Sequence, residues 1–141
     1  MGAWGIGPLE NDGGLDWVRE LADGGTDVES FRSGFEGELE DGYIEAHGDG
    51  VLALLRVARL LDRADGADDG LEDDAGEGLE TDPELLRPVM TGELRLWLVE
   101  AAQKVIAPEG SELYDAWAET PELNEWLGTT REDIDQVRNT L

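Results

Sequence analysis

The sequence predicts an all-α protein, a compact single-domain bundle of six or seven short helices with an extended N-terminal arm. Three observations favour this fold class. Apolar residues recur at helical spacing, capping residues or prolines stand before most of these stretches, and no stretch shows the strict alternation of a β-strand. The chain has 141 residues, 40% of them hydrophobic, which suffices for one core. We therefore expect 1–141 to form a single helical domain.

The N-terminal part of the chain is expected to hold the arm and two helices. Residues 1–10 are rich in glycine with interspersed apolar residues, a pattern that indicates an extended segment held by aromatic packing. An apolar stripe over 15–21 predicts the first helix, and a second stripe over 28–39 predicts the next. Thr26 and Glu29 have the spacing of a capping box, so we expect the second helix to begin there.

The most apolar segment, 51–61, predicts a central and largely buried helix. Its narrow polar face carries Arg56, Arg59 and Arg63. The residues just before it, 47–50, read His-Gly-Asp-Gly, which is typical of an exposed turn.

Residues 64–82 have a different composition, dominated by Gly, Asp and Glu, and we interpret them as a flexible acidic loop within the domain. With Asp65 in the first position of a calcium loop, Gly76 would take the twelfth, where a bidentate Glu is needed. The loop is therefore no EF-hand, and solvated charge is a better interpretation than a weak cation site. The later helices are expected to begin at Pro83, at Thr91 as the cap of 92–106, at Ser111, at Thr120-Pro121, and at Thr130 with Asp133.

The charge balance is strongly acidic, with 35 Asp and Glu against 10 Lys and Arg and a net charge of −25. Such a charge accompanies either disorder or a folded surface adapted to molar salt, where repulsion is screened within about 3 Å at 1 M. The carboxylates are spread over segments that also carry regular apolar patterns, which favours a folded halophilic protein. Lys104 is the only lysine. A nucleic-acid partner is not expected, because no basic stripe is present.

Composition also limits location and chemistry. The chain has no cysteine and one histidine, His47, which excludes disulfides, thiolate zinc sites, cysteine nucleophiles and multi-histidine metal sites. No stretch approaches the roughly 18 apolar residues of a membrane span, and the first residues do not resemble a secretion signal. We expect a soluble cytoplasmic protein with no membrane partner, no cofactor and no resident metal. The oligomeric state stays open.

Two groups of polar residues are candidates for function. Arg56, Arg59 and Arg63 share one helical face and could clamp an anion or an acidic partner. The alternative, which we favour, is that they pair with the protein's own carboxylates. His47 has Glu45 and Asp49 as neighbours, which could orient it, but in a turn of this composition a surface histidine is the better interpretation.

The sequence opens with Met-Gly-Ala-Trp-Gly, continues with Asn11-Asp12, and places Asp16-Trp17 on the first predicted helix. A second motif, Ser-Glu-Leu followed by Trp117, lies in 111–117. In both motifs the chain resembles a bacterial and archaeal family known only as a domain of unknown function (number forty-two fifty-nine). Leu9 stands where that family usually has Phe. The resemblance implies a helical domain of this length and brings no activity with it.

The residues that match the family's opening admit two interpretations. In the structural one, Trp4 and Trp17 pack the arm onto the first helix while Asn11 or Asp12 caps it. In the functional one, Asp16 and its neighbours line a polar binding site beside the two tryptophans. Capping explains Asn11 and Asp12 and leaves Asp16 unexplained, so Asp16 is the candidate binding residue, with Trp4 and Trp17 beside it.

Two functions follow as hypotheses. The first is a noncatalytic binding or regulatory protein, for example an immunity-like protein that masks another protein; small size, acidity and few catalytic side chains support it. The second is a carboxylate-dependent hydrolase, with or without a metal ion, that uses Asp16, Glu45, His47 and Asp49. It requires several of these side chains to converge with shifted pKa values.

Overall fold

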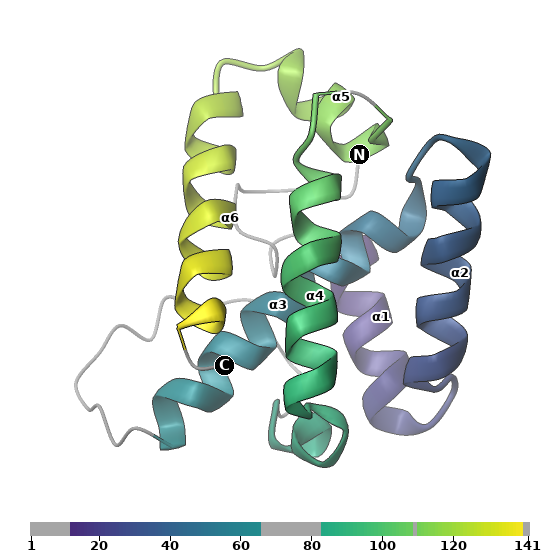
Figure 1. The fold of residues 1–141 in the computed structure, drawn as a ribbon, viewed down its shortest axis with the longest axis vertical. Helices are drawn as coiled ribbons and strands as arrows, with labels where there is room; N and C mark the ends of the chain where they lie inside the picture. The colour runs from purple at the N-terminus through teal and green to yellow at the C-terminus, as the bar shows by residue number, and fades with distance from the viewer. Residues whose placement is uncertain (1–11, 66–82, 109, 140–141) are drawn as a thin grey trace.

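Six α-helices and one 3-10 helix make up the part of the chain that the structure, a computed structural model, describes: residues 12–65, 83–108 and 110–139. The all-α prediction is confirmed, and the helices pack as a bundle (Figure 1). The predicted arm and most of the predicted acidic loop lie outside these residues. The elements are α1 (Asp12–Asp23), α2 (Val28–Asp41), α3 (Ala46–Asp65), η3 (Pro83–Val89), α4 (Gly92–Val105), α5 (Glu112–Ala118) and α6 (Leu123–Arg138).

Helix α3 is the centre of the bundle, as the apolar run predicted. It contacts all six other elements, and in Figure 1 it crosses behind α4 between α6 and α1. Every residue from Val51 to Arg59 is buried. A helix that is buried on nearly all sides can be apolar on nearly all sides, so its composition and its position agree.

The prediction of an exposed turn at 47–50 is wrong, because these residues form the first turns of α3. Gly48 and Gly50 are buried. A Cβ atom on Gly50 would lie 2.6 Å from a ring carbon of Phe31 and 2.7 Å from one of Trp17. A Cβ atom on Gly48 would lie 3.0 Å from Ile44 and 3.5 Å from Val105 of α4. Gly50 therefore lets α1 and α2 approach the α3 backbone closely, and Gly48 does the same for α4, a reason that sequence pattern does not reveal.

Caps fix several helix starts. Thr91 caps α4 by accepting a hydrogen bond from the Leu94 N–H at 3.1 Å, and Ser111 caps α5 in the same way; both were predicted. The predicted capping box at Thr26 is wrong. Asp27 caps α2 instead, accepting from the Ser30 N–H at 2.7 Å.

One long helix, α6, replaces the two short helices predicted near the C-terminus. The predicted capping pair, Thr130 and Asp133, lies in the middle of α6, and both side chains are buried. Asp133 is bonded to Arg56 and Arg59 of α3. This contact between distant segments gives Asp133 a partner inside the bundle, which local sequence could not indicate.

A short backbone link joins the α2–α3 connection to the start of α5. The Ile44 N–H donates to the Gly110 carbonyl at 2.7 Å, and the Glu112 N–H donates to the Ile44 carbonyl at 2.8 Å. Gly42, at φ +88°, ends α2 in the left-handed conformation that favours glycine. Together these features build a corner where α2, α3 and α5 meet.

No helix within the described ranges combines the length and the apolar character needed to cross a bilayer.

Candidate functional site

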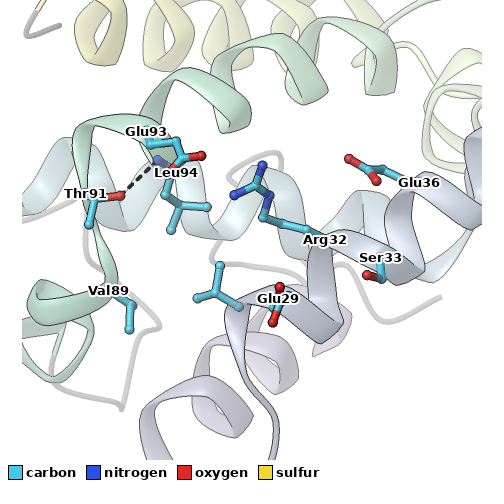
Figure 2. Close-up of a pocket in the computed structure, with 9 residues that line it drawn as sticks. Glu29, Arg32, Ser33, Glu36, Val89, Thr91, Glu93 and Leu94 are labelled. Atoms are coloured by element: carbon cyan, nitrogen blue, oxygen red, sulfur yellow. Dashed lines mark hydrogen bonds between the residues drawn. The ribbon is translucent and has the colours of Figure 1, made fainter.

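A groove of about 640 Å³ opens between the N-terminal halves of α2 and α4 and the end of η3 (Figure 2). Its volume falls in the range of about 300–1,000 Å³ that is usual for ligand sites. The residues that line it are Val28, Glu29, Arg32, Ser33 and Glu36 of α2, Val89 of η3, Thr91, and Glu93 and Leu94 of α4.

Arg32 is the cation of this groove. Figure 2 shows its side chain extending from α2 toward α4, with Glu29, Glu36 and Glu93 on different sides of it. Its guanidinium carbon lies 5.2 Å from the ring centroid of Trp97, within cation–π range. It forms no ion pair with any described residue, although Glu29 and Glu36 have the helical spacing that usually permits one.

The three glutamates of the groove are exposed, and no hydrogen bond or ion pair joins them to another described residue. With one arginine among them, the lining carries a formal charge of −2. The groove is therefore an anionic surface whose only internal cation is held against a tryptophan ring.

Apolar side chains lie in and beside the groove. Leu94 is buried, whereas Val89 is 40% exposed. Leu85, one turn earlier on η3, is 56% exposed. Together with Leu96 they are the exposed large apolar residues of the described part of the chain. Val89 and Leu85 therefore leave apolar surface exposed along η3, whereas Leu96 lies outside the groove lining.

The corner between α2, α3 and α5 holds a second group of polar residues. Nδ1 of His47 lies 2.6 Å from Oε2 of Glu38, and Oε1 of Glu38 accepts a 2.6 Å hydrogen bond from the Glu45 N–H. The ring of His47 packs 4.7 Å from that of Trp17 and 5.5 Å from that of Phe31. The prediction of a surface histidine is wrong, since only 20% of the His47 side chain is exposed.

Asp49 lies in the same corner, on the first turn of α3. Burial, followed by the negative charges of Glu112 and Glu38, raises the pKa of Asp49 from 3.8 to about 6. Tyr43 donates a 2.8 Å hydrogen bond to Asp115, and this bond is the main reason why its pKa rises to about 12. We call Glu38, His47, Asp49 and Glu112 the corner cluster.

The corner cluster can hold and exchange a proton near neutral pH, because a carboxyl with a pKa near 6 changes its charge there. Among the described residues no set of three or more His, Asp or Glu side chains is arranged to hold a metal ion. The raised pKa of Asp49 permits acid–base chemistry at this corner.

The arginines predicted on the face of α3 lie inside the bundle. Nε of Arg56 is 2.9 Å from Oδ2 of Asp133, and an Nη of Arg59 is 2.6 Å from Oδ1 of the same carboxylate. Both arginines are 8% exposed. Pairing with the protein's own carboxylates, the interpretation favoured from sequence, is what these two residues do. The side chain of Arg63 is outside the described part.

Asp16 lies on the solvent side of α1, 61% exposed and 2.7 Å from Arg19. Trp17 points inward and packs edge-on against Phe31 at 4.9 Å. Trp4 lies outside the described residues, so the predicted packing of Trp4 on Trp17 stays a prediction. A binding role for Asp16 also stays a prediction, and the structure places it in neither the groove nor the corner cluster.

The groove residues were missed from the sequence. Arg32, Glu29 and Glu36 read as an ordinary solvated helix face, and Val89 follows a proline in a short segment. What brings them together is the packing of α2 against α4 through Phe31, Phe35 and Trp97. The one available signal was Trp97, a large residue at the edge of the predicted α4 stripe.

Fold and site define a small all-helical domain with an anionic groove. The chain belongs to the family described as "Domain of unknown function (DUF4259)", whose model matches residues 2–129, as the two sequence motifs had suggested. No curated protein and no solved structure matches the chain.

Proposed function

We propose that this chain is a noncatalytic binding protein that captures a protein partner of net positive charge in the groove between α2, η3 and α4. The observation that carries the proposal is the groove itself, whose lining combines three exposed glutamates, none of them paired with a described residue, with the apolar residues Val28, Val89 and Leu94. Complementary potentials steer association and reject partners of the wrong charge. An immunity-like role, in which the groove masks a basic surface of another protein, is one form of this function.

The exposed apolar residues support a protein partner over a small metabolite. Val89 and Leu85 extend the apolar surface beyond the groove along η3, and stable protein interfaces need such a core surrounded by polar residues. A net charge of −25 opposes contact with nucleic acid or with an anionic membrane. We propose that binding takes place in a cytoplasm of high salt, to which the acidic composition is suited.

The test is affinity capture from a native-salt extract with the wild-type chain and two variants. Val89→Arg places a cation in the groove, whereas Leu96→Arg places one on an exposed residue of α4 outside the lining. We expect wild type and Leu96→Arg to retain one basic partner in stoichiometric amount, and Val89→Arg to lose it. Equal capture by Val89→Arg, with unchanged circular dichroism, would contradict the proposal.

The second candidate function is a hydrolase that relies on the corner cluster, and one observation favours it. His47 contacts Glu38, and the pKa of Asp49, raised by burial and by the charges of Glu112 and Glu38, is about 6, as a general acid requires. Asp16, also named for this role, lies elsewhere on α1. A hydrolytic activity that follows the ionisation of a group near pH 6 and disappears in Asp49→Asn would establish this function; inactivity across ester, amide and phosphoester substrates would remove it.

A further inference from the structure

We infer that the anchor of the partner is a lysine or arginine side chain flanked by an apolar residue, inserted into the groove between α2, η3 and α4. This inference rests on the proposed function and specifies its ligand. The head group would lie among the carboxylates of Glu29, Glu36 and Glu93, and the stem would lie on Val28 and Val89.

Three sources of charge in the groove decide between a cationic and an anionic ligand. The glutamates contribute −3 and Arg32 contributes +1. The N-terminus of α4 lies at Thr91 and contributes about +0.5 through the helix dipole. The sum stays near −1.5, so an anion would be repelled. Glu93 also lies in the first turn of α4, where it offsets much of that dipole.

Arg32 offsets one of the three negative charges of the groove, and a ring contact holds its guanidinium, not an ion pair with a described residue. Its guanidinium stacks on Trp97, which is in turn packed edge-on against Phe31 and Phe35 at 6.1 and 5.4 Å. The glutamates are thus left for an external cation. An ion pair in a groove is also screened less by salt than one on an open surface.

The apolar residues of the lining are the reason why a side chain with a long stem fits better than a free ion. Lysine and arginine bury their methylene stems on apolar surface while the charged head stays among polar groups. Val28 and Val89 provide that surface beside the glutamates, and Val89 and Leu85 leave apolar area for a neighbouring residue.

The experiment uses three synthetic peptides, glycine-flanked Leu-Arg-Leu, Leu-Lys-Leu and Leu-Gln-Leu, at a salt concentration that keeps the chain folded. Binding is followed by tryptophan fluorescence, since Trp97 contacts Arg32 of the groove lining. Each ion pair contributes about threefold in affinity, so two give about tenfold. We expect the Arg and Lys peptides to bind about ten times more tightly than the Gln peptide, and the double variant E29Q/E93Q to abolish this preference.

The matched control is E100Q, which removes a carboxylate from an exposed position of α4 outside the groove; it should keep the preference. Equal affinity for all three peptides, an equal loss in E100Q, or no binding at all would overturn the inference. The partner-capture experiment separates this failure from that of the function. If Val89→Arg still loses the partner while the peptides show no preference for a cation, only the ligand assignment is wrong.

Discussion

Two regions of α3 differ in the groups that surround a buried carboxylate. In its middle, Arg56 and Arg59 share the carboxylate of Asp133, which is 1% exposed, at 2.9 and 2.6 Å. At its first turn, Asp49 is partly buried beside Glu38 and Glu112, and burial and repulsion raise its pKa to about 6. In the first region the charges satisfy one another; in the second, the carboxylates outnumber the cations.

The difference shows how a chain with few cations distributes them. Of 10 basic residues against 35 acidic ones, two lie in the core, where an unpaired carboxylate would be most unfavourable. A third, Arg32, is held on Trp97. The corner cluster and the groove are consequently left with excess negative charge. The same shortage of cations leaves Asp49 beside two other carboxylates, and it is the basis of our proposal that the groove binds a cationic partner.

Removal of salt should have the largest effect. Without screening, the self-repulsion of −25 charges opposes folding, so we expect helical circular dichroism to disappear as KCl falls well below molar. Amides of the corner should lose hydrogen-exchange protection at a higher salt concentration than those in the middle of α3. A chain that keeps its melting temperature in dilute buffer would contradict the halophilic interpretation.

Asp133→Asn should be the most damaging substitution. It removes the charge of the buried carboxylate that Arg56 and Arg59 share, and breaking a buried pair in this way costs about 3–5 kcal/mol of unfolding free energy. Denaturant titration at constant salt measures it. Glu132→Gln is the matched control, because Glu132 is 63% exposed and 3.5 Å from Arg59, and it should change stability by about 0.5 kcal/mol or less. Equal losses of unfolding free energy in the two variants would mean that the buried ion pair contributes no more to stability than the exposed one.

Asp49→Asn should increase the free energy of unfolding, and the size of this increase should depend on pH. The folded pKa of about 6 lies above the ordinary value of 3.8, so the folded state binds the proton more tightly. The contribution of protonated Asp49 to stability is complete below about pH 3.8 and is lost as pH rises through 6.

We therefore expect Asp49→Asn to gain about 2 kcal/mol at pH 8, at roughly 1.4 kcal/mol per pKa unit less the part that water screens, and almost nothing near pH 4. Thermal melts of both chains over this pH range test it. Glu45→Gln removes an exposed charge from the same corner and should show no such dependence. A gain that does not vary with pH would refute the role of burial.

Two alanine substitutions in α2, with the smallest expected effects, test how closely His47 packs against that helix. A Cβ atom on Gly34 would collide with Nε2 of His47, whereas one on Gly37 meets nothing within 4 Å. Gly34→Ala should therefore cost about 1–2 kcal/mol, and Gly37→Ala should gain about 0.5–1 kcal/mol from helix propensity. A gain of stability in both variants would show that the His47 ring moves aside without cost.

The sequence predicted the fold class, the central helix and the caps at Thr91 and Ser111, because these depend on local spacing and on hydrogen bonds within a few residues. The predictions were wrong where the role of a residue depends on a contact with a segment far away in the sequence. Asp133 looked like a cap and is a buried ion-pair partner of α3. The glycines at 48 and 50 were interpreted as a turn, whereas Gly50 allows α1 and α2 to approach α3 closely and Gly48 allows the same for α4.

The candidate site was predicted less well than the fold. Pairing of Arg56 and Arg59 with internal carboxylates was favoured from sequence, since acidic residues were abundant. The burial of His47 could not be foreseen, because Glu38 and Trp17 reach it from two other helices. The groove combines α2 with η3 and α4, elements separated by about fifty residues of sequence, and no local pattern joins them.

The most direct test of the central claim, recognition of a cationic partner in the groove, is a titration of the isotope-labelled chain with the Leu-Arg-Leu peptide, followed by amide chemical shifts. The account predicts that the shifts concentrate in 28–36, in 89–94 and at the Trp97 indole, and saturate. Shifts that concentrate instead in the corner cluster would contradict it and would favour the acid–base site.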